Sequence, residues 1–329
     1  MKSSSGGAFI AICRAFENVD DGEKRYYGAA FDDELNVIHL SVASADRCRI
    51  FQGSKYVRSR CGVEIYSAVA DDLIKGRRVL FSGTPCQVYA LKKYLSTKGV
   101  SDVNLLLVDI ICHGTPKKQV WDDYKTWLEM KYKSKMTEYS FRYKPEGWKA
   151  YPGYAKFENG KTAVNTAETS VFSNLQMQGL ITEQGCFKCR FSSQERCGDI
   201  TLGDFWGVEK IIPQILYKNG VSLVLVNSEK GQNVIDCITK QCSGGQYIQV
   251  TDDNRYLEYQ HNLRKPTDMP YNYVQFQKDY KALSFNDICR KYAGYGVKYR
   301  AMYSIRKFIR KTPLIEWYRS LKKKNLTDR

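Results

Sequence analysis

The fold of this chain is decided by the stretch Arg78-Val79-Leu80-Phe81-Ser82-Gly83-Thr84-Pro85-Cys86-Gln87. Its first four residues predict a short strand, the Gly-Thr-Pro segment predicts a tight turn, and residues 87–95 have the spacing of a helix. The mostly apolar run 103–111 then predicts a buried strand. Strand, turn, helix and strand in this order indicate a parallel pair of strands in an α/β sheet.

The segments around this stretch extend the pattern. We expect helices over residues 9–16 and 63–74, a hairpin over 27–40, and a further buried strand over 220–227. Short polar–aromatic alternation within residues 139–168 predicts a small antiparallel β insertion, with Asn159-Gly160 as its hairpin turn. The expected fold is therefore α/β, with a mixed, largely parallel central sheet and flanking helices over residues 3–265, followed by a basic helical extension over 266–329.

Composition limits the class of protein. The chain has 329 residues, of which 43% are hydrophobic, and this is enough for a sizeable core. No stretch approaches the roughly 20 apolar residues of a membrane span, and the start has no apolar signal region, so we expect a cytoplasmic protein. Eleven cysteines in such a chain are expected to be ligands, reactive thiols or core residues rather than disulfides.

The positive charge is concentrated at the end of the chain. From Arg290 onward, 13 Lys or Arg residues face two acids, which gives +11 of the formal +16. No helix-turn-helix, zinc-finger or RNA-binding signature accompanies this charge, so nucleic acid is not the expected partner. The tail also has apolar residues at helical spacing, and Pro313 should start a second short helix; the apolar positions are Ile305, Phe308, Ile309, Trp317 and Leu321.

Three interpretations of this tail stay open. It is a solvated terminal helix, an interfacial helix on anionic lipid at the inner face of the membrane, or a docking patch for an acidic ferredoxin. Both functional interpretations predict association that weakens with salt.

Four cysteines stand in predicted turns. Cys86 and Cys112 follow predicted strands, and Cys186 and Cys189 form a Cys-x-x-Cys. Ligands of α/β sheets bind at the carboxyl ends of the strands, where the first two cysteines fall. Four thiolates from three segments describe a tetrahedral sulfur site, either an iron–sulfur cluster or structural zinc. We favour the cluster, because structural zinc sites commonly pair two short Cys-x-x-Cys segments and this chain has one. Cys197 is a spare thiol.

Taken together, these motifs resemble the beta subunit family of coenzyme F(420) hydrogenase/dehydrogenase over roughly residues 3–265. The matching segments, in the family's order, are Ser-Ser-Gly-Gly at 4–7, Gly53-Ser54-Lys55-Tyr56 with Ser59, Gly-Thr-Pro-Cys-Gln at 83–87, Cys-His-Gly at 112–114, Phe141-Arg142-x-Lys144 with Gly147-Trp148, Cys186 with Cys189, Gly-Asp-x-x-x-Gly-Asp-Phe-Trp-Gly at 198–207, and Gly220-Val221-Ser222. The resemblance implies an FAD-binding α/β domain with one 4Fe-4S cluster. It also implies electron exchange between a hydride donor or acceptor and one-electron carriers.

Many relatives carry a ferredoxin-like segment before the Ser-Ser-Gly-Gly, and this chain starts there. The expected partner is therefore a ferredoxin-like carrier or a separate ferredoxin subunit, unless that segment has been lost. Many bacterial relatives look like parts of polysaccharide-synthesis systems. The alternative function is a non-catalytic accessory protein of such a pathway, with structural zinc or no metal.

The expected site residues follow from these motifs and from their chemistry. Glycines before a helix can bind a pyrophosphate, a histidine can carry a proton, and polar side chains beside the cysteines can tune a cluster. The alternatives are a flexible N-terminus, a surface turn, a buried satisfied histidine and a solvated strand face. We expect His113 and Lys55 to be catalytic. The cofactor-binding set is Ser5, Gly6, Gly7, Lys55, Tyr56, Ser59, Gly83, Thr84, Gln87, His113, Arg142, Lys144 and Asp204, and the metal ligands are Cys86, Cys112, Cys186 and Cys189.

Overall fold

The computed structural model describes residues 3–144, 147–149, 152–241 and 253–310. The chain forms two compact units. The sheet unit comprises residues 1–118, 140–151 and 182–269, and the helical unit comprises residues 119–139, 152–181 and 270–329. The β insertion and the C-terminal helices belong to the same compact unit, and the expected domain boundary between residues 265 and 266 stays a prediction.

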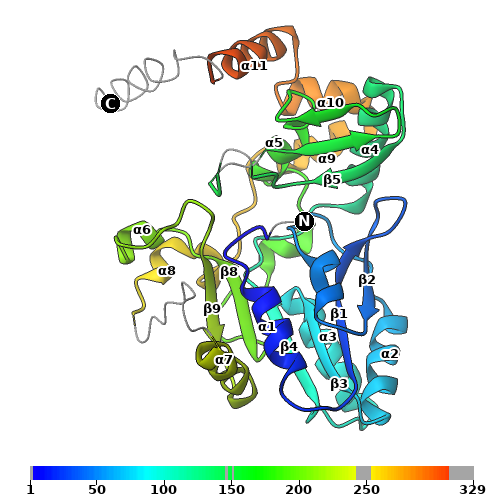
Figure 1. Cartoon of the computed structure of the whole chain (residues 1–329). Helices are drawn as coiled ribbons and strands as arrows, with labels where there is room; N and C mark the ends of the chain where they lie inside the picture. Colours follow the sequence, from blue (N-terminus) through cyan, green and yellow to red (C-terminus); the bar gives the residue numbers. More distant parts are fainter. Residues whose placement is uncertain (1–2, 145–146, 150–151, 242–252, 311–329) are drawn as a thin grey trace. The chain divides into compact units, whose positions relative to one another are not determined.

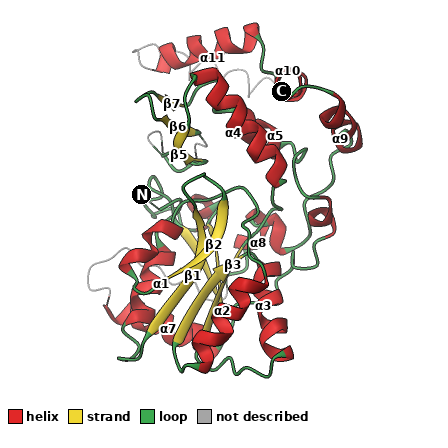
Figure 2. Ribbon diagram, turned by 90° about the vertical axis from the view of Figure 1, so that its right-hand side faces the viewer, coloured by secondary structure: helices red, strands yellow, loops and turns green. Residues whose placement is uncertain are grey.

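The sheet unit contains a six-stranded sheet (Figure 2). Its four inner strands run parallel, and the two edge strands are antiparallel to their neighbours, so the expected mixed, largely parallel sheet is confirmed. The strand order is β2 (Val37–Val42), β1 (Lys24–Phe31), β3 (Arg78–Gly83), β4 (Leu105–Ile110), β8 (Ile200–Asp204) and β9 (Ser222–Val226).

Helices cover both faces of this sheet (Figure 1). On one face lie α1 (Ala8–Glu17) and α7 (Glu229–Gln241), whose buried side chains contact Leu80 and Val108 of the sheet. On the other lie α2 (Val63–Ile74) and α3 (Pro85–Thr97). Strand residues therefore alternate between two cores, as the pleat requires. The smaller elements of this unit are η1 (Asp46–Phe51), η2 (Gln184–Lys188), α6 (Val208–Ile211), α8 (Tyr256–Tyr259) and η3 (His261–Leu263).

The turn from β3 into α3 forms as its sequence predicts. Thr84 is the N-cap, its backbone N–H donates to Gln87 Oε1 at 3.0 Å, and Pro85 occupies the first turn of the helix. This capping box satisfies amides that the helix start would otherwise leave without partners. Because β3, β4 and β8 are parallel, their carboxyl ends meet at one edge of the sheet, where Cys86, Cys112 and Asp204 emerge.

Among its described residues, the helical unit combines a three-stranded sheet with five helices. The order β5 (Met136–Ser140), β6 (Tyr154–Phe157), β7 (Thr162–Val164) and the antiparallel β6–β7 hairpin confirm the expected β insertion. Gly160 has a φ of 78°, as the tight turn of this hairpin requires. The helices are α4 (Lys118–Tyr132), α5 (Val171–Met177), α9 (Tyr273–Ala282), α10 (Phe285–Tyr292) and α11 (Val297–Arg310).

Aromatic side chains form the core of the helical unit. Trp121 lies edge-on to Tyr139 and Phe172, with ring centroids 4.9 and 5.8 Å apart. The hydroxyl of Tyr299 on α11 contacts Ser170 and Asn174, each at 3.1 Å. The tail is therefore helical as far as residue 310, and Tyr299 connects α11 to the rest of this unit. The expected second helix, with Pro313, Trp317 and Leu321, lies outside the described residues.

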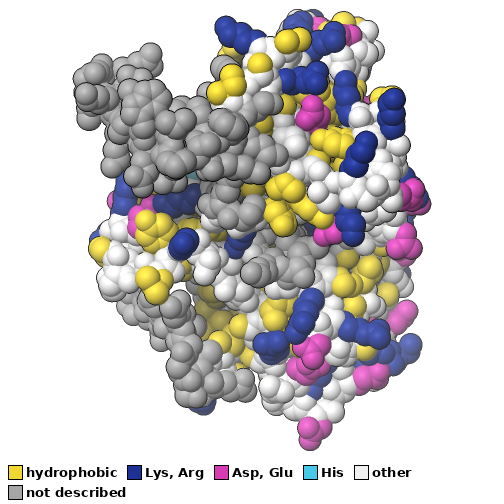
Figure 3. Space-filling model, turned by 45° about the horizontal axis from the view of Figure 1, so that its top comes forward, with side chains coloured by type: hydrophobic (Ala, Val, Ile, Leu, Met, Phe, Trp, Pro, Cys, Tyr) yellow, Lys and Arg dark blue, Asp and Glu magenta, His cyan; other side chains and the backbone are white. Residues whose placement is uncertain are grey.

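Surface charge follows the basic composition. Figure 3 shows Lys and Arg side chains spread over the face that it draws, rather than gathered in a single patch. Among the described residues, no helix is both long enough and apolar enough to span a membrane.

Candidate functional site

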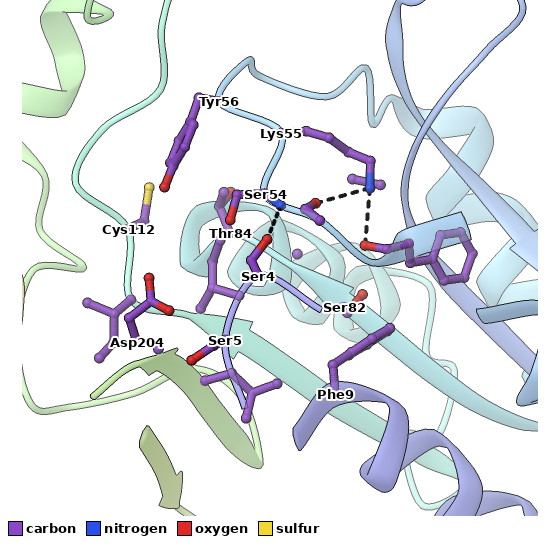
Figure 4. A pocket seen from close by; sticks show the side chains of 18 of the residues that line it. Ser4, Ser5, Phe9, Ser54, Lys55, Tyr56, Ser82, Thr84, Cys112 and Asp204 are labelled. Atoms are coloured by element: carbon purple, nitrogen blue, oxygen red, sulfur yellow. Dashed lines mark hydrogen bonds between the residues drawn. The ribbon is translucent and has the colours of Figure 1, made fainter. Parts of the chain in front are cut away.

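A pocket of about 300 Å³ opens at the carboxyl edge of the central sheet (Figure 4). It lies within the sheet unit and is lined by residues 3–5, the loop 51–59, the β3–α3 turn, the segment 110–116 and the end of β8. Edges of this kind are where α/β sheets bind ligands. Of the expected site residues, those that line it are Ser5, Lys55, Tyr56, Ser59, Gly83, Thr84, Gln87, Cys112, His113 and Asp204.

The N-terminal segment is fastened to this pocket. Ser4 Oγ accepts a hydrogen bond from the N–H of Ser54 at 2.7 Å, and Ser5 Oγ donates to the carbonyl of Val221 at 2.7 Å. A Cβ on Gly6 would meet a backbone nitrogen at 2.8 Å, so only glycine fits there. Gly7 caps α1 with a φ of 100°. The segment is therefore held in place rather than a loose end, although Gly6 and Gly7 do not line the pocket.

The Lys55 amine binds backbone carbonyl oxygens of the loop that carries it. Its Nζ lies 3.0–3.3 Å from the carbonyl oxygens of residues 50–53, at the end of η1. Burial lowers the pKa of this amine to about 7. The side chain thus satisfies carbonyls that the helix end leaves open. In the view of Figure 4 its amine lies on the opposite side from Cys112.

Gln87 joins two walls of the pocket. Its Nε2 donates to Ser59 Oγ at 2.9 Å, while its Oε1 accepts from the N–H of Thr84. A Cβ on Gly83 would lie 3.2 Å from the same Oε1. Gln87 and Ser59 therefore satisfy each other and fix the loop 51–59 against the start of α3.

Asp204 stands at the pocket wall in a fixed orientation. Arg142, which is buried, forms an ion pair with Asp204 Oδ2 and donates to the carbonyl of Trp148 at 3.2 Å. Trp148 Nε1 donates to Asp204 Oδ1 at 3.0 Å, and its ring stacks on Trp206 with centroids 4.8 Å apart. The charge of Arg142 is thus balanced by Asp204. β5 ends at residue 140, so Arg142 follows this strand instead of lying in it.

Lys144 is also engaged by the protein rather than placed in the pocket. Its Nζ donates to the carbonyls of Ser5 and Asn219, both at 3.2 Å. Burial and the neighbouring Arg142 lower its pKa to about 8. Lys144 therefore ties the N-terminal segment to the loop before β9, and neither it nor Arg142 lines the pocket.

His113 and Tyr56 present rings to the pocket. The His113 side chain is open to solvent within a concave wall, and desolvation by the surrounding protein lowers its pKa despite an opposing contribution from Asp204. Its imidazole is therefore neutral near pH 7 and can accept a proton. Tyr56 lies edge-on to Phe141 with centroids 5.8 Å apart, and burial raises the pKa of its hydroxyl. Figure 4 places the Tyr56 ring on the Cys112 side of the pocket.

The other three cysteines of the expected cluster act electrostatically on Cys112. Burial, followed by the charges of Cys186, Cys86 and Cys189, raises the pKa of the Cys112 thiol to about 12. Because electrostatic interactions weaken with distance, all three thiols lie near Cys112. Gly114 allows this approach, since it has a φ of 99° and a Cβ there would lie 3.2 Å from Cys186 Cβ.

Hydroxyl groups accompany two of these thiols. Thr84 Oγ1 lies 3.1 Å from Cys86 Sγ, and Thr115 Oγ1 lies 3.9 Å from Cys186 Sγ. Within the described part of the chain, no three His, Cys, Asp or Glu side chains gather closely enough to hold a single metal ion. The thiolates around a cuboidal cluster are spaced on the order of 6–7 Å apart, wider than the ligands of one zinc ion.

One pocket residue gave no signal in the sequence. His39 is 3% exposed, stacks on Phe81 with centroids 5.3 Å apart, and has its Nε2 3.0 Å from the carbonyl of Ser82. Burial lowers its pKa to about 4. Its Nδ1 has no hydrogen-bond partner among the described residues. A lone histidine in a predicted strand cannot be distinguished from an ordinary core histidine by pattern alone.

A buried ion pair links the two cysteine-bearing segments. Arg196 donates to Asp109 Oδ1 at 2.9 Å, to the carbonyl of Ile110 at 3.1 Å and to that of Phe191 at 2.9 Å. Ile110 precedes Cys112 by two residues, and Phe191 follows Cys189 by two. One guanidinium thus holds both segments together, and no sequence motif marked it.

This architecture defines an α/β protein with a pocket at the carboxyl ends of its parallel strands, and Cys112 lines that pocket. The sequence profile for the C terminus of the coenzyme F(420) hydrogenase/dehydrogenase beta subunit matches residues 76–250, and the chain belongs to that family. One similar solved structure comes from a xenon derivatization study of the F(420)-reducing [NiFe] hydrogenase complex from Methanosarcina barkeri. It has 15% sequence identity, covers 85% of this chain and 86% of that chain, and gives a TM-score of 0.49. No curated protein matches the chain.

Proposed function

We propose that this chain is a flavin- and iron–sulfur-dependent oxidoreductase subunit, with FAD in the pocket and a 4Fe-4S cluster on Cys86, Cys112, Cys186 and Cys189. The observation that carries the proposal is the position of Cys112. This residue lines the pocket, and the charges of the other three thiols raise its pKa. A group bound in the pocket would thus lie beside a group bound to the cysteines. Membership of the hydrogenase/dehydrogenase beta subunit family supports a redox role.

Bound FAD would supply hydride chemistry, with F(420) as one candidate substrate, and the cluster would supply one-electron chemistry. The residues of the chain would bind and orient these groups. Residues 4–7 precede α1, and their amides and the helix start suit a phosphate group. Thr84 can donate a hydrogen bond to the Cys86 sulfur, and such bonds tune cluster potential. Neutral His113 can take up the proton that accompanies flavin reduction.

Asp204 and Lys55 have supporting roles in this proposal. The ion pair with Arg142 and the bond from Trp148 fix the Asp204 carboxylate, which can accept a hydrogen bond from a ribose or flavin group. Lys55 shapes the loop 51–59 through its backbone contacts. We therefore assign Lys55 to positioning rather than to catalysis.

The test is cofactor analysis of anaerobically purified protein. We expect about four iron and four sulfide per chain, as a 4Fe-4S cluster requires, together with one FAD. Cys112→Ser should lose most of the iron, while Cys237→Ser, a half-buried cysteine of α7, should retain it. One zinc per chain without sulfide would favour the structural metal site. A chain with neither iron nor flavin would favour the accessory protein.

A further inference from the structure

Cys86 differs from the other three proposed ligands in its exposure. Its side chain is exposed, whereas Cys112, Cys186 and Cys189 are partly buried. A cluster on these thiols would therefore come nearest to solvent on the Cys86 side. A one-electron carrier protein that docks there would have the shortest path to the cluster.

Two cations contact the ring of Tyr89, one helical turn from Cys86. The Arg190 guanidinium lies 4.4 Å from the ring centroid of Tyr89, and Lys93 Nζ lies 5.7 Å from the same centroid. Tyr89 follows Cys86 by three residues in α3, and residues at this spacing are neighbours on one helix face. Arg190 directly follows Cys189. The cations therefore flank a ring one helical turn from the exposed thiol.

Further positive charge surrounds this position. The positive charges of Lys92 and Arg190 both lower the pKa of the Cys197 thiol. The charge of Arg58 lowers the pKa of Cys61, and the charge of Cys86 raises it. Lys188 stands between the two cysteines of the Cys-x-x-Cys. We define the Cys86 face as five exposed residues: Arg58, Lys92, Lys93, Lys188 and Arg190.

This charge is poorly balanced by the protein itself. In the described ranges of the chain, none of the five residues of the Cys86 face forms an ion pair. Glu64, which acts on Cys61, is an acidic neighbour. A cluster of unpaired cations attracts an acidic surface and speeds its association, while the docked interface itself can stay small and short-lived.

We propose that the Cys86 face is the docking surface for an acidic one-electron carrier protein of the ferredoxin class. One electron leaves the reduced carrier and enters the cluster, or returns in the opposite direction, and no covalent bond is made or broken. The inference rests on the proposed cluster. It places the carrier on the Cys86 face instead of on the basic C-terminal tail.

The test is a charge reversal on the full-length protein with its cluster. Lys92→Glu with Lys93→Glu changes two exposed residues of α3 that do not line the pocket. The matched control is Lys278→Glu with Lys281→Glu, which makes the same change of charge on α9. Stopped-flow mixing with a reduced acidic ferredoxin at low salt gives the second-order rate constant. Iron content and the rate of reduction by dithionite are measured for each variant.

We expect the rate constant to fall about tenfold or more in the α3 variant and to depend less on ionic strength, because steering accounts for factors of this size. The control should stay within about twofold of the unmodified protein, and all three should match in iron content and in reduction by dithionite. Equal rate constants for the two variants, with clusters intact, would overturn the docking surface alone. A purified chain without a cluster would overturn both the docking surface and the proposed function.

Discussion

Replacement of Arg196 by methionine is the most quantitative test of how the cysteine segments are held. The Arg196 side chain is 2% exposed, and Asp109 is fully buried. Besides its bonds to Asp109, Ile110 and Phe191, the guanidinium donates to the carbonyl of Ser193 at 3.2 Å. Methionine keeps much of the aliphatic volume but removes every one of these donors.

The expected loss of stability follows from these contacts. Removing one partner of a buried ion pair costs about 3–5 kcal/mol, because the remaining charge stays buried. Asp109 keeps two donors, Thr201 Oγ1 at 2.6 Å and the N–H of Gly198 at 3.0 Å, which favours the lower part of this range. The carbonyls that lose a donor add to the cost. We therefore expect the free energy of unfolding to fall by about 4 kcal/mol in Arg196→Met.

A double-mutant cycle separates the charge from the packing. Asp109→Asn removes the buried charge and still accepts a hydrogen bond, so Asp109→Asn with Arg196→Met should lose clearly less stability than the sum of the single variants, with a coupling of about 2 kcal/mol. Urea unfolding followed by circular dichroism gives these values, and iron content reports whether the cysteine segments still meet. The reasoning is refuted if Arg196→Met loses less than about 1 kcal/mol, or if the two changes are additive.

Three further predictions concern the pocket and its supports. The pKa of His39 is lowered to about 4 from an ordinary value of 6.5, so between these pH values the unfolded chain binds a proton that the folded chain does not. The free energy of unfolding should therefore fall by up to roughly 3 kcal/mol as pH drops from 6.5 to 4. Urea unfolding should show a smaller fall in His39→Gln. An equal fall in both proteins would contradict the lowered pKa of His39. Gly207→Ala places a Cβ 2.3 Å from an aromatic ring at a φ of 75°, whereas the Cβ of Gly76→Ala, at a φ of 77°, meets nothing within 4 Å. Thermal unfolding should show Gly207→Ala as less stable than Gly76→Ala by about 1–3 kcal/mol. Equal melting temperatures would count against the contact. Gly7→Val should lower the flavin content per chain, while Gly160→Val, also at a positive φ, should leave it unchanged; full flavin retention in the first variant would argue against the proposed placement of FAD.

Local pattern was sufficient for most of the central sheet and for part of the site. The predicted strands of the central sheet, the helix over residues 63–74 and the turn before α3 are all present, because hydrophobic periodicity and turn residues act within a few positions of the chain. The positions of Cys86 and Cys112 after parallel strands were sufficient to predict that they would meet at one edge. The sequence by itself thus determined the architecture of the sheet unit and the place of its pocket.

The partners of the charged residues were decided by the tertiary structure. Arg142 and Asp204 are 62 residues apart, and Arg196 and Asp109 are 87 apart, so no local pattern could pair them. Lys55 lies close to its partners in sequence, yet only the fold of its loop turned the amine toward the backbone. The helical unit is likewise assembled from three separate segments. The physical reason is that periodicity records which face of an element is buried, whereas the partner of a buried charge depends on which distant segment folds against that face.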